Sequence, residues 1–343
     1  MARAHASRFS KVKEEVEVTA LVDIIPERAQ AVADLLGGTV ATGYREILPL
    51  VDAVLVVLPH HLHCPVTLDC LRAGKHVLVE KPLALNEAEA LEMMRTAREC
   101  GRVLMVAYCM RFHPLVLELK RHLDEKTYGE TFALSIWTEQ YTHYPEGHWG
   151  LARATLGGGQ LFSHGCHYID LMLWMLGRPV SGSHLGTRKG TPWMEGEGTS
   201  MVTLAFEGGK LGYHGATWGA RGTRLGTAFH ALCTGGMLEA DIRHGKLWFH
   251  GASEDHEPGQ PVRQKSEVLL DLPNAKPTDE EMLHFLECIR TGRTPLTDAV
   301  SSLEGLRVIW ELYRAEEEGR LADLRGFGLG TFREEDGFSG SQE

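Results

Sequence analysis

The feature that most constrains the fold is an alternation of short apolar runs with amphipathic, helix-like segments in the first third of the chain. The apolar runs lie at 16–22, 53–58, 76–79 and 103–107. The helical patterns lie at 2–15, 26–36, through Cys70 as far as Gly74, and 86–100. Short, apolar strands joined by helices are typical of a parallel sheet covered on both faces. We therefore predict an α/β domain over residues 1–115.

After about residue 115 the pattern changes to residues that alternate between apolar and polar, with glycine turns between them. Such segments lie at 131–137, 200–206, 210–215, 229–234 and 246–250. This period of two predicts a mostly antiparallel sheet. Helical patterns at 161–176, 278–291 and 299–318 accompany it. We expect a second, α+β domain over 116–325 and a loosely ordered tail over 326–343.

Composition excludes several classes of function. The chain has 35 Lys and Arg against 46 Asp and Glu, a net charge of −11, which argues against nucleic acid or anionic lipid as a partner. It has no apolar run long enough for a membrane helix and no secretory signal at its start. Seven dispersed cysteines without a CxxC pair predict free thiols in the cytoplasm. The 18 histidines show no metal-ligand spacing, so we predict no metal site.

The start of the chain resembles a dinucleotide-binding unit that lacks its first part. Such a unit runs from a strand through GxGxxG and a helix to a second strand that ends in an acid. The helix at 2–15 and a strand ending in Asp23 are present, but only Met1 precedes them. One interpretation is that Met1 is an internal methionine or that the chain was cut. The other is that the protein dispenses with a tightly bound dinucleotide; we favour the first, because it gives Asp23 a purpose.

Two segments at the ends of predicted strands carry candidate chemistry. Glu80-Lys81-Pro82 directly follows the strand at 76–79, where side chains of a parallel sheet point into the ligand crevice. Lys81 could hydrogen-bond a substrate hydroxyl, although a solvated lysine after a strand is common. The segment Leu58-Pro59-His60-His61-Leu62-His63 follows the strand at 53–58. We expect its residues to line a nicotinamide and its ribose; a polar loop with a helix-capping histidine is the alternative.

Two further segments lie near the predicted domain boundary and beyond it. Tyr108 and Arg111 follow the last strand of the first domain, where clefts form between domains. We expect both to contact the substrate and Arg111 to contact the cofactor as well. Gly157-Gly158-Gly159 introduces a helix on which Ser163, His167 and Asp170 are spaced along one face. A histidine suits the transfer of a hydroxyl proton near neutral pH. Asp170 fits a structural role better than a catalytic one.

In this order and spacing the segments resemble the glucose–fructose oxidoreductase/inositol dehydrogenase/MocA family. The resemblance rests on HHLHCPVTLDCLRAGKHVLVEKPLALN, AYCMRFHP and GGGQLFSHGCHYIDLMLWMLG, and on a C-terminal pattern that begins at FLECIRTGRTPLTD. It covers essentially residues 2–320. It implies a Rossmann domain, truncated at its first strand, followed by an α+β domain with an open sheet through which members often form oligomers. We therefore expect a homo-oligomer, either dimer or tetramer.

The resemblance also implies an activity and roles for residues. Family members oxidise or reduce a secondary alcohol or carbonyl of a sugar, inositol or related polyol with NAD or NADP. By position Lys81 matches the family's catalytic lysine, His167 its acid/base histidine and Asp23 the acid that binds the adenosine ribose. The carboxylate of Asp23 would repel a 2′-phosphate, so NAD is favoured over NADP.

The chain departs from the family at Ser163, where the family commonly has Asp. Serine can make a hydrogen bond but cannot raise the basicity of His167 as a carboxylate would; His164 could compensate. Upstream of the glycines, Trp149, with His148 and Tyr144, is expected to form a wall on which a sugar stacks. The substrate and the direction of reaction stay open.

The mechanistic hypothesis is that His167 removes a hydroxyl proton while hydride leaves the same carbon for the nicotinamide, with Lys81 at the same hydroxyl. One alternative is a redox-assisted glycosidase or epimerase of the same family, which would return the hydride in each cycle. Another is a cofactor-free sugar-binding protein.

Overall fold

The computed structural model describes residues 1–9, 11–252, 264–273 and 277–329, and the chain divides into two compact units. The first unit comprises Met1–Phe112 and Lys276–Ser302. The second comprises His113–Ala275 and Leu303–Glu343. The grouping of 276–302 with the first 112 residues was not predicted from the sequence. Residues 330–343 of the predicted tail lie outside the described residues.

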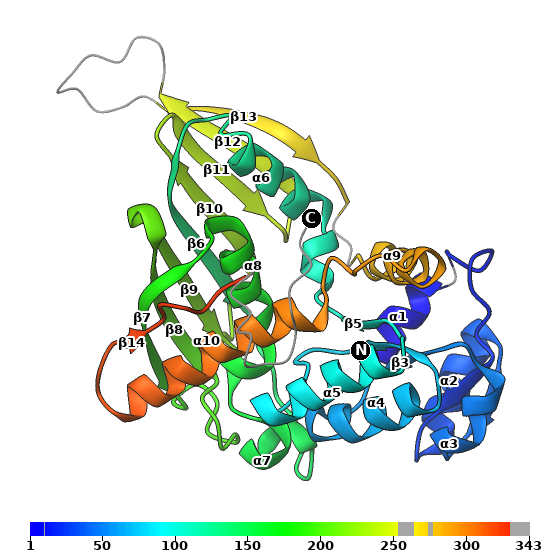
Figure 1. The fold of residues 1–343 in the computed structure, drawn as a ribbon. Coiled ribbons are helices and arrows are strands. Elements are labelled where there is room, and N and C mark those ends of the chain that lie inside the picture. Colours follow the sequence, from blue (N-terminus) through cyan, green and yellow to red (C-terminus); the bar gives the residue numbers. More distant parts are fainter. Residues whose placement is uncertain (10, 253–263, 274–276, 330–343) are drawn as a thin grey trace. The chain divides into compact units, whose positions relative to one another are not determined.

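The first unit contains the predicted parallel strands, but these form two sheets (Figure 1). One sheet pairs β1 (Ala20–Val22) with β2 (Thr39–Ala41). The other has the order β3 (Ala53–Val56), β4 (His76–Val79), β5 (Leu104–Val106). Within the described residues no strand pairs with both β1 and β3.

Helices connect these strands and bury their apolar faces. They are α1 (Ala2–Phe9), α2 (Pro26–Leu36), α3 (Tyr44–Ile47), α4 (His63–Arg72), α5 (Glu87–Glu99) and α9 (Thr278–Thr291), with short 3-10 turns at Leu48–Leu50, His60–Leu62 and Cys109–Phe112. The core of the unit joins residues from distant segments, among them Val12, Leu78, Met105 and Phe285. The helix predicted over 2–15 was too long: α1 ends at Phe9. Turns follow it, yet Val12 is still buried in the core.

The second unit is built on one nine-stranded sheet. Its strands are β6 (Thr131–Glu139), β7 (Pro179–Thr187), β8 (Thr199–Phe206), β9 (Leu211–Thr217), β10 (Thr227–Cys233), β11 (Gly236–Asp241), β12 (Lys246–Ala252), β13 (Gln264–Asp271) and β14 (Ala322–Asp323). They lie in the order β13-β12-β11-β10-β6-β9-β8-β7-β14. Only the β6–β9 pair is parallel among the described pairings. The prediction of a mostly antiparallel sheet is confirmed.

Helices cover one face of this sheet (Figure 1). They are α6 (Pro114–Asp124), α8 (Cys166–Leu176) and α10 (Ala299–Glu317). The unit also contains α7 (Arg153–Leu156), 3-10 turns at Trp149–Leu151 and Glu207–Gly209, and a π-helical turn at Leu161–Gly165. α6 contacts β11 and β12, and α8 contacts β6 and β9. Apolar side chains on the strands are also left exposed: Leu185 is 71% exposed and Leu211 58%. The sheet therefore has an open face.

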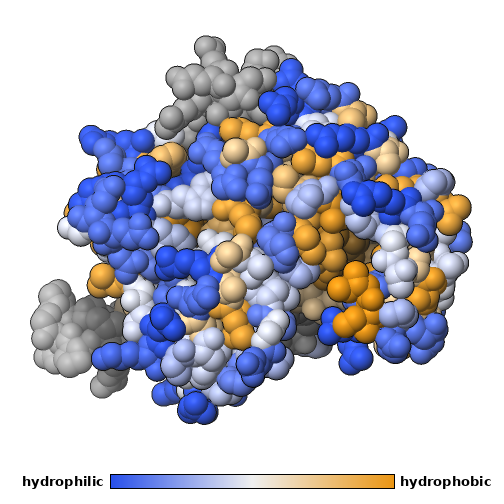
Figure 2. Space-filling model, turned by 90° about the horizontal axis from the view of Figure 1, so that it is seen from below, coloured by the Kyte–Doolittle hydropathy of each residue, from blue (hydrophilic) through white to orange (hydrophobic). Residues whose placement is uncertain are grey.

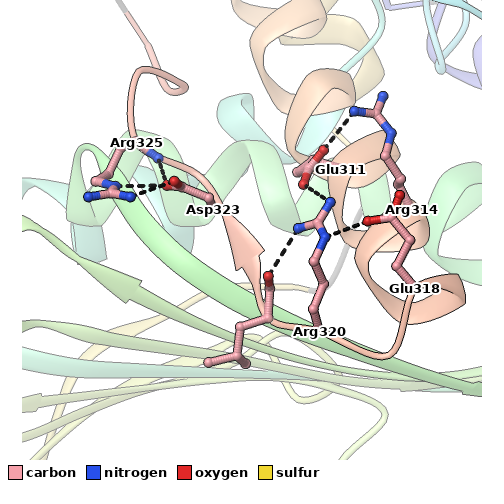
Figure 3. A network of polar contacts seen from close by, with 7 residues as sticks. Glu311, Arg314, Glu318, Arg320, Asp323 and Arg325 are labelled. Atoms are coloured by element: carbon pink, nitrogen blue, oxygen red, sulfur yellow. Dashed lines mark hydrogen bonds and ion pairs between the residues drawn. The ribbon is translucent and has the colours of Figure 1, made fainter.

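An ionic network fixes the chain where it leaves α10 and enters β14 (Figure 3). Arg320 bonds both Glu311, at 2.8 Å, and Glu318. Glu311 also pairs with Arg314 at 3.1 Å. Exposed ion pairs contribute little singly, but a network with a partly buried carboxylate holds a defined geometry. The C-terminal half of α10, which matters for the site below, is anchored in this way.

The surface is mixed in character. Figure 2 shows one face of the molecule, on which polar residues predominate and apolar residues gather in separate patches. Among the described residues no helix has the length and apolar content that crossing a lipid bilayer requires.

Candidate functional site

In the first unit the segment Glu80-Lys81-Pro82 follows β4 directly, at the carboxyl edge of the three-stranded sheet. The backbone N–H of Glu80 donates to Val56 O at 2.9 Å, which continues the sheet pairing to the end of the strand. The Glu80 side chain is buried, and its Oε1 lies 2.8 Å from Nε2 of His5 on α1. Sequence reasoning missed His5, because a single histidine in a helix carries no pattern that points to a partner 75 residues away.

The charge state of Glu80 follows from these neighbours. Burial alone would raise its pKa, but the hydrogen bond from His5 and the charge of Lys81 outweigh burial and lower the pKa below its ordinary value. Glu80 is therefore a carboxylate beside Lys81, whose own side chain is partly exposed. This arrangement places a buried carboxylate next to the lysine at the end of the strand.

His63 links the two strand-end segments. Its Nδ1 lies 2.7 Å from Pro82 O and its Nε2 3.0 Å from Leu58 O. A neutral imidazole has one N–H and can donate to only one of these carbonyls, whereas burial lowers the pKa of His63 and opposes the doubly protonated form. The ring is fully buried, which favours a role in holding the loops together over direct contact with a cofactor.

The other residues expected near the nicotinamide occupy the loop after β3. Leu58 and Pro59 are partly exposed, while His60 is only 4% exposed and its ring lies 5.4 Å from that of His63. Leu58, Pro59 and His61 are thus partly exposed, whereas His60 and His63 are buried.

Asp23 lies at the end of β1, as predicted. Its Oδ1 accepts a hydrogen bond from the backbone N–H of Ile25 at 2.9 Å, and its other oxygen has no partner in the described part of the chain. The side chain is partly exposed, and Ile24 next to it is 84% exposed. This is a carboxylate held in one orientation with an oxygen available to a ligand hydroxyl.

Tyr108 and Arg111, expected near the substrate, are buried in the first unit. Tyr108 is 1% exposed, and its hydroxyl accepts a hydrogen bond from Ser302 at 3.2 Å. Arg111 is 3% exposed and donates to Leu296 O at 2.9 Å. Both residues fasten the segment 296–302 onto the end of β5.

In the second unit the triple glycine leads into the helix that carries the remaining candidates. Gly157 ends α7 with φ 91°, a left-handed conformation that glycine adopts without strain. The helix starts with a π-turn at Leu161–Gly165 and continues as α8. The α-helical spacing assumed for Ser163 and His167 therefore does not hold across this turn; π-turns are frequent at functional sites.

The histidines of this helix lie together with buried neighbours. Ser163 is 5% exposed and His167 7%, while His164 is more exposed. The rings of His164 and His167 are 6.0 Å apart, edge to face. Asp170 is fully buried, in keeping with the structural role expected for it.

An aromatic wall adjoins these histidines within the second unit. We give this name to Tyr144, Trp149, Trp193 and Trp218, which pack in one cluster. Trp218 lies 6.4 Å from the ring of His164, and His148 stacks on Tyr144 at 4.4 Å. The buried indole N–H groups of Trp193 and Trp218 have no hydrogen-bond partner among the described residues. Trp149 belongs to the same cluster as Trp218, which lies near His164.

The residues present fit part of a nicotinamide dinucleotide. Asp23 offers a carboxylate oxygen to a ribose, and Leu58, Pro59 and Lys81 lie at strand ends of the parallel sheets. No pyrophosphate-binding glycine loop is among residues 1–343. Within the described residues no group of three His, Cys, Asp or Glu side chains could hold a metal ion.

A parallel-sheet unit with an acid at a strand end, and an open-sheet unit with paired histidines, define the class of Rossmann-type oxidoreductases. Comparison with known families agrees. Residues 1–108 match the oxidoreductase family with an NAD-binding Rossmann fold, and residues 116–239 match the GFO/IDH/MocA C-terminal domain, together about two thirds of the chain. The chain belongs to the glucose–fructose oxidoreductase/inositol dehydrogenase/MocA family.

Several relatives in sequence are named for activity on sugars or polyols. The dTDP-3,4-didehydro-2,6-dideoxy-α-D-glucose 3-reductase of Streptomyces violaceoruber is 36% identical over 47% of each chain. The scyllo-inositol 2-dehydrogenase (NAD(+)) of Bacillus subtilis is 25% identical over 76% of this chain and 74% of its own. The D-xylose 1-dehydrogenase (NADP(+)) 2 of Haloferax volcanii is 27% identical over 90% and 93%. The chain spans about half the length of several of the curated relatives that it matches.

Solved structures share the fold over nearly the whole chain. The aldose-aldose oxidoreductase from Caulobacter crescentus, complexed with glycerol, is 26% identical with a TM-score of 0.78, covering 94% of this chain and 96% of its own. Levoglucosan dehydrogenase in complex with NADH and levoglucosan has a TM-score of 0.81 at 19% identity over 94% and 96%, which supports the fold alone.

Proposed function

We propose that this protein is an NAD-dependent oxidoreductase that interconverts a secondary alcohol and a carbonyl of a sugar, inositol or related polyol. The observation that carries the proposal is the placement of His167 beside His164 and the aromatic wall in one unit of a family whose sequence relatives are named for sugars and polyols. Residues 1–115 would hold the cofactor and residues 116–325 the substrate.

The aromatic wall supports a polyhydroxylated ring as the substrate. Aromatic faces pack against the C–H face of such a ring, while the ring's hydroxyls remain free for hydrogen bonds. His164 and Ser163 are the polar groups on the neighbouring helix that would bind those hydroxyls. Tyr108 and Arg111 would act on substrate binding only indirectly, because both are buried in the first unit, where they hold the segment 296–302.

The chemistry assigned to the chain is proton transfer at one hydroxyl. His167 accepts the proton of that hydroxyl, and Lys81 donates a hydrogen bond to the same oxygen and so favours its alkoxide character. The buried carboxylate of Glu80 adjoins Lys81 in the chain. A nicotinamide, when bound, supplies the acceptor for hydride from the same carbon.

Asp23 supports NAD in preference to NADP. Its carboxylate would bind the hydroxyls of the adenosine ribose and repel a 2′-phosphate. The neighbours Ile24 and Ile25 bring no positive charge that would compensate. Leu58, Pro59, His60 and Pro82 would line or support the nicotinamide end, with His63 holding their loops in place.

The remaining parts of the proposal concern assembly and compartment. The exposed apolar side chains of β7 and β9, Leu185 and Leu211, support self-association through the open sheet face as a dimer or tetramer. All seven cysteines are free thiols, which supports a reducing, cytoplasmic location.

The test is turnover by Lys81→Ala and His167→Ala against a panel of sugars and inositols, with NAD and with NADP. We expect each variant to lose about a hundredfold or more in kcat, because each removes a group that acts on the reacting hydroxyl. Circular dichroism would check the fold. Lys75→Ala and His244→Ala, which make the same changes away from the site, are the matched controls.

Three outcomes would count against the proposal. Wild-type rates in both variants would remove the assigned roles. Product formation with no net change in cofactor absorbance would instead identify the redox-assisted glycosidase or epimerase, and failure to bind NAD in both this chain and a version extended at its N-terminus would favour a sugar-binding protein.

A further inference from the structure

The helix that carries Ser163 and His167 begins in the interior of the second unit, where its first backbone N–H groups need acceptors from elsewhere. The first four amides of a helix have no carbonyl partner within it. All the residues concerned are buried, so water does not satisfy them freely. The amides are those of Gly159, Gln160, Leu161 and Phe162.

The hydroxyl of Tyr313 satisfies two of these amides. Tyr313 lies on α10, about 150 residues further along the chain, and its oxygen accepts from Gly159 N and from Phe162 N, each at 3.2 Å. The same hydroxyl donates its hydrogen to Glu197 at 2.7 Å. A hydroxyl has two lone pairs and one hydrogen, so this group is fully used.

Glu197 satisfies the other two amides. Its backbone oxygen accepts from Gln160 N at 2.7 Å, and its side-chain Oε1 accepts from Leu161 N at 3.0 Å. The residue is 6% exposed and lies just before β8. Two residues that are linked to each other therefore satisfy all four amides.

The triple glycine makes this close approach possible. A Cβ on Gly159 would lie 2.0 Å from Glu197 Oε2, and one on Gly158 would lie 3.0 Å from the hydroxyl oxygen of Tyr313. Any side chain at either position would push the pair away from the amides. The close approach of Glu197 and Tyr313 thus explains why Gly158 and Gly159 carry no side chain.

Contacts between α10 and β7 hold Tyr313 in place. Glu316, one turn after Tyr313, accepts from Gly186 N at 2.8 Å and bonds Nδ1 of His184 at 2.7 Å. The ring of His184 meets that of Tyr313 edge-on at 5.2 Å. The position of Tyr313 is therefore fixed by contacts that do not involve the helix it caps.

We infer that Glu197 and Tyr313 are positioning residues: together they fix the start of the helix that presents Ser163, His164 and His167. The expected effect on turnover rests on the proposed function, whereas the role of Glu197 and Tyr313 in capping the helix does not. A shift of a reacting group by about 1 Å can lower turnover by about a hundredfold. Loss of this cap should therefore act on kcat.

The charge of Glu197 is less important to the cap than its acceptor oxygen. Burial raises the pKa of Glu197, and the hydrogen bonds from Tyr313 and Leu161 offset this only in part. A glutamine would retain the acceptor oxygen without the charge. Glu197 and Tyr313 line a pocket of about 450 Å³. The other charged residues that line it are Arg153, Arg188, Glu195, Glu316 and Glu317. His184 pairs with Glu316.

The test compares Tyr313→Phe, Glu197→Ala and Glu197→Gln in the whole protein. Amide hydrogen exchange, measured without ligand, should speed up about tenfold or more at Gly159 and Phe162 in Tyr313→Phe and at Leu161 in Glu197→Ala, because these amides lose their acceptors. Glu197→Gln should exchange like the wild type. Tyr213→Phe removes a tyrosine hydroxyl from β9, where its partner is Met201, and is the matched control.

The kinetic arm uses a substrate of the wild-type enzyme. We expect kcat to fall about tenfold or more in Tyr313→Phe and Glu197→Ala, with KM within about threefold and with Glu197→Gln restored to near wild type. Unchanged exchange at 159–162 in Tyr313→Phe would overturn the inference, as would faster exchange with undiminished kcat. If no substrate is turned over, the proposed function fails, but the hydrogen-exchange measurement still tests whether Glu197 and Tyr313 cap the helix. If Glu197→Ala does not fold, Tyr313→Phe alone provides the test.

Discussion

The stability of the protein should depend on pH through one buried carboxyl, Glu281 of α9. The side chain is fully buried in the first unit, and neither carboxyl oxygen has a hydrogen-bond partner among the described residues. Burial raises its pKa well above the ordinary value of 4.5, and the nearby charge of Glu80 raises it further. We predict that Glu281→Gln, which cannot ionise, removes this dependence.

The magnitude follows from proton binding. The folded protein holds the Glu281 proton more tightly than the unfolded chain, so stability from this group is full below pH 4.5. It is then lost as pH rises, at about 1.4 kcal/mol per pH unit, until pH passes the raised pKa of the folded state. The free energy of unfolding of Glu281→Gln, relative to wild type, should therefore increase at that rate as pH rises above 4.5, and level off once pH passes the raised pKa.

The assay is urea unfolding followed by circular dichroism at a series of pH values. Glu99→Gln makes the same chemical change on the exposed face of α5 and is the control. Its unfolding free energy should stay within about 0.5 kcal/mol of wild type at every pH. Parallel curves for Glu281→Gln and wild type would refute the reasoning, because they would mean that the carboxyl titrates alike in the folded and unfolded states.

Two further predictions concern the first unit. Asp23→Ser should weaken NAD binding about tenfold or more and leave NADP binding no weaker, measured by calorimetric titration of both cofactors; an unchanged ratio of the two dissociation constants would contradict the ribose role. His63→Ala should lower the free energy of unfolding by about 1–3 kcal/mol, because the carbonyl that accepts the ring N–H, that of Leu58 or of Pro82, loses its donor. A weaker cofactor affinity without loss of stability would instead support direct contact.

Much of the first unit could be predicted from the sequence because its signals are local. The helix at Pro26–Leu36 begins with a proline and ends before a glycine with φ 80°, and both bounds were predicted. The strand at His76–Val79 is wholly buried except for His76, so its apolar run gives its limits. Where local signals weaken, as after Phe9, the predicted helix extended too far.

Strands of the second unit that lack an apolar pattern were missed. β7 (Pro179–Thr187) contains a proline, two glycines and a histidine, which are poor strand formers, yet it pairs with β8 along its length. β13 (Gln264–Asp271) is an edge strand with mostly exposed side chains. Both strands form because a neighbouring strand offers unpaired backbone groups, and single-segment patterns do not report this.

In the candidate site, residue types could be read from the sequence, but the surroundings of each residue could not. The sequence identified the histidines and the lysine by type and position in the chain, but not their burial. His63 is fully buried between two carbonyls, whereas His164 is partly exposed beside Trp218. His5 gave no signal at all, since only the fold brings it to Glu80.

The helix of Ser163 and His167 shows why a short motif is not a complete site. Its glycines, its π-turn and its histidines lie within 157–170, but the acceptors for its first amides come from Glu197 and Tyr313. Tyr313 in turn depends on the anchoring of α10 through Glu316 and the ionic network around Arg320 (Figure 3). Substitutions in β7 or at the end of α10 should therefore shift the start of the helix that carries His167, because the motif gains a fixed geometry only from these distant contacts.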